Sequence, residues 1–424
     1  MNTRIHHSAP GLQGNLAHWL TYLESIHPTT IDLGLNRVQA VANNLGLSFS
    51  DKTVITVAGT NGKGTTCRFL ELACLQQHKT TGVYSSPHLL SYAERVRING
   101  DMASEDDFCQ AFRRIEQIRE DISLTYFEFS TLAALLLMQQ HNVDVLILEV
   151  GLGGRLDATN IISADLAVIT TIDLDHQDWL GDTREAIARE KAGIMRAHKK
   201  AVIGDLSPPS SLLEEVKRLN VDARWAQQDY QFTSTQSWSW QSADNQFTHL
   251  PEPNIPKQNV ATALAVLQHL DWLPDGRQVA QLIDSTTMAG RLQTVKNTPR
   301  VVVDVGHNPQ AVRAMLSWLN TQKFNQLHVV VGMLKDKSIA ATLAELSGVP
   351  GYWYLGDTEG PRGASSQILL QNIDEPLKSQ AKCFSALNLA YQKALDSANK
   401  DDLILVFGSF LTVAAVLRHE SDTQ

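Results

Sequence analysis

The chain has 424 residues, enough for two or three domains around large buried cores. Its formal net charge is −9, which excludes broad, nonspecific binding to nucleic acid or to an anionic membrane as the main function. The densest apolar run, 132–138, is too short to span a bilayer, and segment 1–15 lacks the apolar core of a signal peptide. The four cysteines show no C-x-x-C spacing, so we expect reduced thiols in a cytoplasmic protein.

Short β-branched runs alternate with longer amphipathic segments in the N-terminal half. The predicted strands cover 53–58, 81–86, 143–150 and 165–172. The predicted helices cover 16–26, 64–78, 105–120, 129–141 and 183–196. This alternation predicts an α/β fold with a mostly parallel sheet covered by helices on both faces.

The pattern changes near residue 223. Segment 224–256 is rich in Trp, Gln, Ser and Thr, with aromatic residues at strand-like intervals, and predicts a small peripheral β element. A helix is predicted at 258–270, and a polar, turn-like stretch follows at 289–300. Further strands are predicted at 301–305, 327–333, 351–355 and 402–408. We therefore expect an N-terminal domain at 1–290, a linker at 291–300 and a C-terminal domain at 301–424.

The sequence V-A-G-T-N-G-K-G-T-T, residues 57–66, lies between a predicted strand and a predicted helix. This is the context of a phosphate-binding loop, in which successive backbone N–H groups and the helix N-terminus bind anionic oxygens. Lys63 would approach the terminal phosphates, and Thr65 or Thr66 would offer a hydroxyl to Mg²⁺. A plain glycine-rich connection is the alternative, but the full pattern is much more specific than two glycines.

Two further residues end predicted strands beside this loop. A carboxylate at Glu149, at the end of a buried strand, needs a partner, and beside a phosphate loop a metal ion is favoured over a salt bridge or a helix cap. Ser86 ends a second strand and could reach the same ion. His176 and Lys191 read on their own as a solvated histidine and a surface lysine.

The spacing G-T-N-G-K-G-T, in which Gly64 follows Lys63, resembles the loop of the Mur ligase superfamily of ATP-dependent amide ligases. Nearly the whole chain, from Leu16 to Leu417, resembles the folylpolyglutamate synthase family, and most closely its bifunctional bacterial members. The motifs that carry the resemblance are TIDLGLNRV, VAGTNGKGTTC, GVYSSPHL, ERVRING, SLTYFEFSTLAAL, LEVGLGGRLDATN, DHQDWLG, REKAGI, DVGHNP, GMLKDK, EGPRGA and GSFLTV.

The resemblance implies a two-domain architecture: a P-loop parallel-sheet ATPase domain with a small β element, and a smaller Rossmann-like C-terminal domain. It implies a monomeric, cytoplasmic enzyme that uses ATP and two Mg²⁺ ions. The enzyme would add L-glutamate to dihydropteroate, forming dihydrofolate, and to reduced folates, forming polyglutamates, through an acyl phosphate. The alternatives are the extending activity alone, a cell-wall Mur ligase with a UDP-linked acceptor, and a nucleotide-binding switch without ligation.

The resemblance also implies roles for individual residues. Metal ligands would be Ser86, Glu149, His176 and a carbamylated Lys191. Catalytic residues would be Lys63, Glu149, His176, Lys191 and His307. ATP-binding residues would be Thr60, Asn61, Gly62, Lys63, Gly64, Thr65, Asn259, Arg291 and Asp304.

The pterin and folate pocket is the remaining implied site. Its lining would be Asp32, Leu33, Gly34, Leu35, Thr125, Tyr126, Phe127, Glu128, Arg155, Leu156 and Asp157. Aromatic rings there would stack on a pterin, and the Glu128 carboxylate would accept its N–H groups. The alternative is that Phe127 and Phe129 merely begin a buried helix. Two positions depart from the family: Gly306 replaces the usual Ala, which we expect to matter little, and Leu411 replaces a His.

Overall fold

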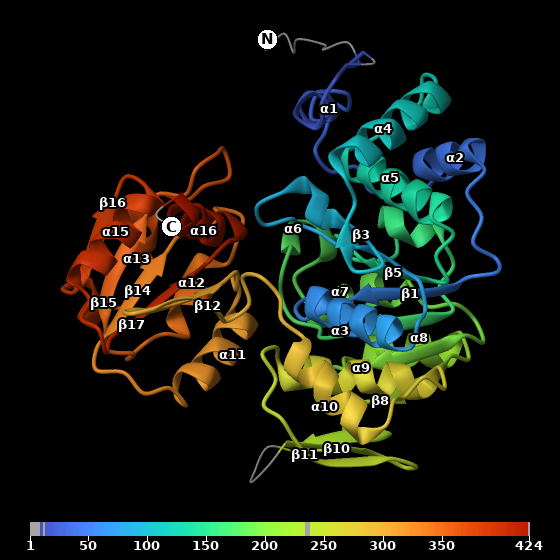
Figure 1. The fold of residues 1–424 in the computed structure, drawn as a ribbon. Helices are drawn as coiled ribbons and strands as arrows, with labels where there is room; N and C mark the ends of the chain where they lie inside the picture. Colours follow the sequence, from blue (N-terminus) through green and yellow to red (C-terminus); the bar gives the residue numbers. More distant parts are fainter. Residues whose placement is uncertain (1–8, 12, 234–237, 423–424) are drawn as a thin grey trace. The chain divides into compact units, whose positions relative to one another are not determined.

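The computed structural model describes residues 9–11, 13–233 and 238–422. The chain forms two compact units (Figure 1). Unit 1 comprises the residues up to Pro253 together with Lys257–Thr286, and unit 2 comprises Asn254–Pro256 and the residues from Thr287 onward. None of the described helices combines the length and apolar composition needed to cross a bilayer.

Unit 1 is built on an eight-stranded sheet with the order β4-β3-β2-β5-β1-β6-β7-β8. The strands are β1 (Thr53–Ala58), β2 (Thr81–Tyr84), β3 (Val96–Ile98), β4 (Asp101–Met102), β5 (Val145–Glu149), β6 (Leu166–Ile169), β7 (Lys200–Ile203) and β8 (Asp222–Trp225). The six strands from β2 to β8 in this order pair in parallel, and β3 and β4 add an antiparallel edge. The predicted parallel sheet is confirmed.

Helices surround this sheet. They are α1 (Leu16–Leu23), α2 (Asn36–Leu45), α3 (Lys63–Gln76), α4 (Glu105–Arg119), α5 (Tyr126–Gln140), α6 (Gln177–Leu180), α7 (Arg184–Ala192), α8 (Ser210–Arg218), α9 (Lys257–His269) and α10 (Gly276–Ser285), with short 3-10 turns η1 (Tyr92–Arg95) and η2 (Ala158–Ile161). Leu146 and Leu148 of β5 belong to the core that packs under α1, α2, α4 and α5. Ile147 points to the opposite face and is equally buried, so both faces are covered.

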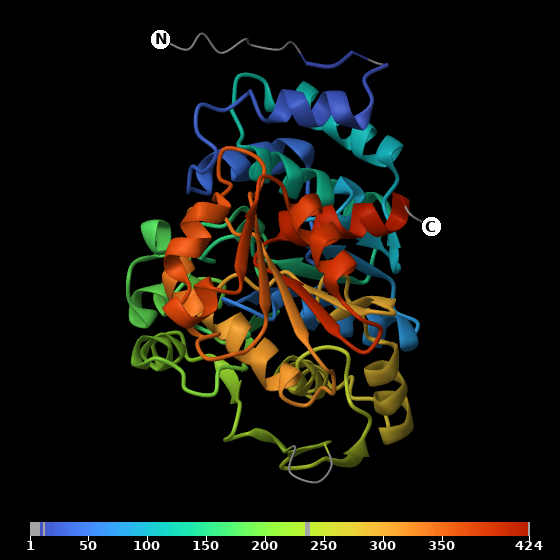
Figure 2. The same cartoon turned by 90° about the vertical axis from the view of Figure 1, so that its left-hand side faces the viewer.

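A small antiparallel sheet lies at the end of unit 1 opposite α1 (Figures 1 and 2). It contains β9 (Tyr230–Thr233), β10 (Trp238–Ser242) and β11 (Gln246–Leu250), in the order β11-β10-β9. Trp240 is fully buried and donates its indole N–H to the carbonyl of Ala261 on α9 at 3.1 Å. The predicted β element is therefore present, although its residues 234–237 lie outside the described part of the chain.

Unit 2 contains a six-stranded sheet with the order β12-β13-β17-β14-β15-β16. The strands are β12 (Gln293–Asn297), β13 (Arg300–Asp304), β14 (Leu327–Val331), β15 (Tyr352–Gly356), β16 (Ala381–Phe384) and β17 (Leu403–Phe407). All neighbours pair in parallel except β12 and β13. The helices are α11 (Pro309–Leu319), α12 (Ile339–Ala344), α13 (Ser366–Asn372), α14 (Glu375–Lys378), α15 (Leu387–Ser397) and α16 (Phe410–Asp422).

The predicted linker at 291–300 needs correction. Five of its residues form β12, which pairs antiparallel with β13 and so belongs to the sheet of unit 2. The segment looked turn-like because it is polar, yet an edge strand tolerates polar side chains, since one of its sides has no neighbouring strand. The division between the units falls between Thr286 and Thr287.

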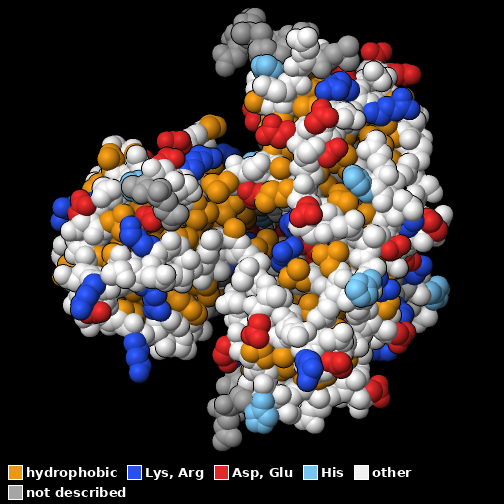
Figure 3. Space-filling model, in the orientation of Figure 1, with side chains coloured by type: hydrophobic (Ala, Val, Ile, Leu, Met, Phe, Trp, Pro, Cys, Tyr) orange, Lys and Arg blue, Asp and Glu red, His pale blue; other side chains and the backbone are white. Residues whose placement is uncertain are grey.

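Acidic and basic side chains are interspersed on the face of unit 1 that Figure 3 shows. This agrees with the ordinary charge content of the sequence, where 45 acidic residues face 36 Lys and Arg.

Candidate active site

The glycine-rich turn between β1 and α3 has the geometry of a phosphate-binding loop. Gly62 precedes α3 in the left-handed conformation, with a φ of 87°. A Cβ atom at this position would lie 2.5 Å from Oδ1 of Asn259, so the backbone and the neighbouring side chain both require glycine. The N-terminus of α3 opens on the turn, where backbone N–H groups and the helix dipole favour an anion.

Residues 170–171, which follow β6, form hydrogen bonds with this turn. The backbone N–H of Thr60 donates to the carbonyl of Thr171 at 2.7 Å, and the N–H of Asn61 donates to the Thr171 hydroxyl at 3.1 Å. The hydroxyl of Thr170 donates in return to the carbonyl of Asn61 at 2.6 Å. The turn is therefore held in shape by its neighbours before any ligand arrives.

The first side chains of α3 lie against the turn. Nζ of Lys63 donates to the Gly59 carbonyl at 3.0 Å, and the Thr65 hydroxyl donates to the Gly62 carbonyl at 3.0 Å. Asn259, in the first turn of α9, donates from Nδ2 to the Thr65 hydroxyl at 2.8 Å. Its buried amide thus contacts the loop itself.

Glu149 and Ser86 lie at the carboxyl ends of adjacent strands. Glu149 ends β5 and is in register with Val57 of β1, so it shares a sheet edge with the phosphate loop. Ser86 follows β2, which also pairs with β5. Burial raises the pKa of the Cys67 thiol on α3, and the charge of Glu149 is the next cause. The Glu149 carboxylate, which is 6% exposed, is therefore within electrostatic range of the first turns of α3.

Lys191 is a buried lysine on α7, only 4% exposed. Burial first, and then the charge of Lys63, lower its pKa to about 7, while Asp175 and Asp157 act in the opposite direction. His176 follows Asp175 and precedes α6 with a φ of 52°, and its side chain is 36% exposed. These couplings place Lys191 near the phosphate-loop lysine and near the loops that follow β5 and β6.

The segment Thr125–Glu128 begins α5 with a reciprocal capping box. The Thr125 hydroxyl accepts the N–H of Glu128 at 3.2 Å, and Oε2 of Glu128 accepts the N–H of Thr125 at 2.7 Å. The ring of Phe127 packs on Gly151, where an added Cβ would lie 2.6 Å from it, and stands 5.8 Å from the ring of Tyr84. The predicted acceptor loop therefore contacts the G-L-G-G turn after β5.

Glu128 has partners within the protein at both carboxylate oxygens. It is 3% exposed, and its second oxygen accepts Nη2 of Arg37 at 3.1 Å. Arg37 also holds Asp32, at 2.8 Å, and Nε2 of His27 lies 3.2 Å from the same carboxylate. Both oxygens of Glu128 are thus engaged within the protein, whereas the side chain of Asp32 is 39% exposed and open to a ligand.

Sequence reasoning missed Arg37 and His27. Arg37 lies within the quoted motif TIDLGLNRV and could have been found there as a cation close in sequence to the predicted Asp32. His27 carries no comparable signal. The neighbouring predicted residues Leu33, Gly34 and Leu35 are half-buried in the segment before α2.

Asp157 organises the loop that follows β5. It is 3% exposed and accepts the N–H groups of Gly151 and Leu152 on one oxygen and the N–H and hydroxyl of Thr159 on the other. Burial raises its pKa, and these hydrogen bonds oppose the rise. Arg155 is exposed and pairs at 2.8 Å with Glu190, while Leu156 is half-buried.

The predicted residues of unit 2 gather at the carboxyl end of β13. Asp304 is 9% exposed and accepts the N–H groups of Leu292 at 2.9 Å and Gly306 at 2.7 Å. Burial raises its pKa, and the charge of Arg291 is the largest opposing effect. The guanidinium of Arg291 lies over the ring of Phe410, and Nδ1 of His307 is 2.9 Å from the Val305 carbonyl.

Comparison with known proteins identifies the family. The model of the Mur ligase middle domain matches residues 57–249, and that of the Mur ligase glutamate ligase domain matches 290–410. The dihydrofolate synthase/folylpolyglutamate synthase of Escherichia coli is 45% identical over 411 residues, covering 96% of each chain. This chain belongs to the dihydrofolate synthase/folylpolyglutamate synthase family. The Haemophilus influenzae member is 42% identical, covering 94% of this chain and 96% of that protein.

Solved structures of the family agree with the fold. Escherichia coli FolC in complex with DHPP and ADP is 44% identical, with a TM-score of 0.93 over 98% of this chain and 99% of that chain. The bifunctional folylpolyglutamate synthase/dihydrofolate synthase of Yersinia pestis complexed with AMPPNP and Mn ion is 46% identical, with a TM-score of 0.91 over 97% and 99%. The predicted family and the α/β ligase architecture are both confirmed.

The two departures from the family's usual sequence have different surroundings. A Cβ atom on Gly306 would lie 2.9 Å from Oδ1 of Asp304 and 3.1 Å from Cβ of Ala311, so the alanine of other members would require an adjustment here. The expectation that this change matters little therefore needs qualification. Leu411 is 48% exposed on α16 and offers no group that replaces a histidine.

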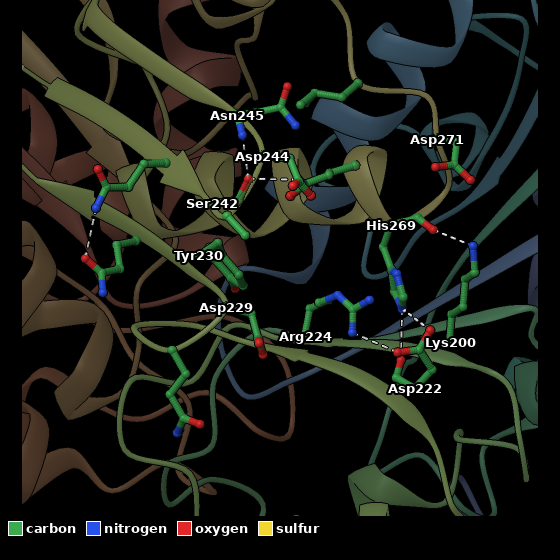
Figure 4. Close-up of a pocket in the computed structure, with 16 residues that line it drawn as sticks. Lys200, Asp222, Arg224, Asp229, Tyr230, Ser242, Asp244, Asn245, His269 and Asp271 are labelled. Atoms are coloured by element: carbon green, nitrogen blue, oxygen red, sulfur yellow. Dashed lines mark hydrogen bonds and ion pairs between the residues drawn. The ribbon is translucent and has the colours of Figure 1, made fainter.

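Unit 1 also contains a polar pocket of about 950 Å³ at the opposite edge of its main sheet (Figure 4). Lys200 and Asp222, which begin β7 and β8, line it together with Arg224 and His269. Nε2 of His269 lies 2.9 Å from the Asp222 carbonyl, and Arg224 pairs with the Asp222 carboxylate at 2.8 Å. The residues that the family resemblance assigns lie elsewhere, so this pocket is separate from the candidate active site.

Proposed function

We propose that this chain is an ATP- and divalent-metal-dependent ligase that joins L-glutamate to dihydropteroate and to reduced folates. Dihydrofolate is the product with dihydropteroate, and polyglutamates are the products with reduced folates. The observation that carries the proposal is that the phosphate loop, Glu149 and the support of the acceptor loop follow one another along the carboxyl edge of the main sheet of unit 1. The phosphate loop follows β1, Glu149 ends the adjacent β5, and Gly151, two residues later, supports Phe127 of the acceptor loop.

The chemistry requires activation of a carboxylate, which does not react with an amine in water. Transfer of the γ-phosphoryl group from ATP to a carboxylate oxygen gives an acyl phosphate and ADP. The amine of glutamate then attacks the carbonyl carbon, the C–O bond to phosphate breaks, and phosphate departs with the amide formed. Lys63 and the N–H groups of its turn stabilise negative charge on the transferred phosphoryl group.

Lys191 has the properties that carbamylation requires. With a pKa of about 7, a large share of the side chain is a neutral amine near neutral pH, and only this form attacks CO₂. The N–C bond forms, a proton leaves, and the cation becomes an anion beside Lys63. This change of charge removes the repulsion between the ammonium groups of the buried Lys191 and the half-buried Lys63.

The donor chemistry fits a magnesium site. Among the described residues, no three His, Cys, Asp or Glu side chains converge as a ready metal cluster. The proposed set is instead Ser86, Glu149, His176 and carbamylated Lys191, which is mostly oxygen and leaves room for the phosphate and water ligands that Mg²⁺ prefers. The bound ions, two in this proposal, would neutralise phosphate oxygens. ATP would also contact Asn259, Arg291, Asp304 and His307.

The acceptor pocket uses the remaining residues. Asp32 and the segment 33–35, Thr125 to Phe127, and Arg155 with Leu156 would contact the pterin and its benzoate. Glu128 and Asp157, whose oxygens are engaged internally, would hold the two loops in place.

One assay tests the proposal and its closest alternative. Purified protein is incubated with Mg·ATP and L-glutamate, and ADP and the folate product are measured with dihydropteroate or tetrahydrofolate as the acceptor. We expect glutamate-dependent ADP release with both. Turnover with tetrahydrofolate alone would reduce the function to polyglutamate extension, and turnover with neither would remove the proposal.

A further inference from the structure

Arg95 is a buried cation that no carboxylate neutralises within the described structure. The residue ends η1 and is 8% exposed. Its side chain donates from Nε to Nδ1 of His88 at 2.9 Å, and it forms no ion pair with an Asp or Glu among the described residues. The adjacent Glu94 directs its two oxygens to the backbone N–H groups of residues 89–91 instead.

Two aromatic rings enclose the Arg95 guanidinium. Its central carbon lies 5.3 Å from the ring centre of Tyr92 and 5.4 Å from that of Tyr126. Cation–π contacts offset part of the desolvation of a buried guanidinium but supply no hydrogen-bond acceptors. The two Nη atoms of Arg95 form no hydrogen bond among the described residues, and they are not sealed from solvent. Their N–H groups are therefore available to a ligand with anionic oxygens.

Arg95 lies against the acceptor loop and against the end of β2. Tyr126, one of its two aromatic neighbours, belongs to the acceptor loop. The carbonyl of Arg95 accepts the N–H of Ser85 at 2.9 Å, one residue before the proposed metal ligand Ser86. Arg95 therefore contacts both the acceptor loop and the strand end next to Ser86.

Arg37, the other cation of the acceptor region, provides the contrast. Its guanidinium already binds the carboxylates of Asp32 and Glu128, at 2.8 and 3.1 Å. Its charge is balanced within the protein, so an incoming carboxylate gains little from it. Arg95 has no such balance, and a carboxylate is the group that would supply it.

We infer that Arg95 binds the carboxylate of the folate-type acceptor and holds it for phosphoryl transfer. The inference rests on the proposed function, which it deepens by assigning a cation to the reacting end of the acceptor. The guanidinium presents a planar pair of N–H donors that matches the two oxygens of a carboxylate.

The test compares two ligands that differ only at the recognised group: dihydropteroate and its neutral carboxamide analogue. Affinities are measured by calorimetry with the wild-type protein, Arg95→Gln and Arg95→Lys. In the wild type we expect the acid to bind about 10- to 100-fold more tightly than the amide. Arg95→Gln should remove this preference by weakening the acid alone, and Arg95→Lys should retain part of it.

A purely structural role would weaken the acid and the amide equally, because both need the same loop, and an unchanged preference in Arg95→Gln would overturn the inference. Equal binding of acid and amide to the wild type would overturn it without any variant. Arg224→Gln, in the polar pocket at the opposite sheet edge, is the matched control and should keep the wild-type preference. If the wild type bound neither ligand, both the proposed acceptor and this inference would be wrong. If the wild type turned over dihydropteroate but Arg95→Gln kept the preference for the acid, only the role of Arg95 would be wrong.

Discussion

Two lysines of unit 1 illustrate how surroundings change one kind of side chain. Lys63 begins α3 and points its ammonium at backbone carbonyls of its own loop. Lys191 is buried on α7, and its pKa falls to about 7. The first lysine remains a cation suited to phosphate, and the second is poised to lose its charge.

The first prediction concerns Lys63. Lys63→Ala should reduce ADP formation by about 100-fold or more, because the charge on the transferred phosphoryl group loses its protein cation. Far-UV circular dichroism should be unchanged, since the side chain donates to backbone carbonyls of its own loop. Lys199→Ala, which removes an exposed lysine paired with Asp165, is the control and should keep full activity. Near-normal turnover in Lys63→Ala would contradict the loop assignment.

The second prediction concerns carbamylation. Lys191→Ala should lose activity, and acetate should restore part of it by placing a carboxylate where the carbamate stood. Steady-state rates with and without acetate provide the measurement. Lys217→Ala, on the exposed side of α8, should be active and insensitive to acetate. Full activity of Lys191→Ala without acetate would rule out the carbamate role.

The third prediction uses the pKa of Lys191 in CO₂-free buffer. Between about pH 7 and the ordinary lysine value of 10.5, the unfolded chain binds a proton here that the folded chain does not. The free energy of unfolding should therefore rise with pH across this window, by up to about 1.4 kcal/mol per pH unit, and show no such slope below pH 7. Urea titrations at pH 7 and 9 should show a smaller rise for Lys191→Met than for the wild type, and equal rises would contradict the lowered pKa.

At the scale of elements, the capping box of α5 explains why the predicted start of this helix was wrong. The helix was expected to begin at Phe129, but it begins at Tyr126, because Thr125 and Glu128 cap its first turn reciprocally. The pattern T-x-x-E is visible in the sequence. The capping rule would have predicted both the start of the helix and the hydrogen bond from the Thr125 N–H to the Glu128 carboxylate.

The fourth prediction tests this cap. Thr125→Ala should lower the free energy of unfolding by about 0.5–2 kcal/mol, since the N–H of Glu128 loses its acceptor. Thr125→Ser retains a hydroxyl and should be close to the wild type. Chemical denaturation of the three proteins gives the comparison, and equal losses in both variants would point to the lost methyl group instead of the hydrogen bond.

Buried strands were predictable and edge strands were not. β1, β5, β14 and β17 are rich in Val, Ile and Leu because both faces of each are covered. β12 is mostly polar and β16 has only four residues, so neither stands out in the sequence as a strand. Partners such as Arg37 for Glu128, 91 residues apart, depend on tertiary packing that no local pattern reports.

At the scale of the whole molecule, each unit has its own sheet and its own apolar core. The motifs quoted from the sequence predicted the family and the nature of both units. They predicted the end of the first domain at residue 290, whereas the division falls between Thr286 and Thr287, and they assigned the polar edge strand β12 to a linker. The monomeric state and the cytoplasmic location stay predictions, which size-exclusion chromatography with light scattering and cell fractionation would check.

The fifth prediction concerns nucleotide binding by the full chain. A ligand that binds only the folded state stabilises it by about 2.7 kcal/mol at a free concentration of 100 Kd. Mg·AMPPNP should therefore raise the Tm in calorimetry. Lys63→Ala should show a smaller rise at the same concentration, and Lys199→Ala should match the wild type. An identical rise in Lys63→Ala would separate that lysine from nucleotide binding.

The glycines of the proposed site imply two kinds of mutational tolerance. At Gly62, the positive φ and the amide of Asn259 exclude any side chain, so a saturation library selected only for folding should return glycine there. Gly34 lies in the acceptor segment with nothing within 4 Å of an added Cβ, and the same library should accept many residues. A second selection would require the enzyme's activity for growth. If glycine were preferred at position 34 only in that selection, the bound folate would lie too close to residue 34 to leave room for a side chain.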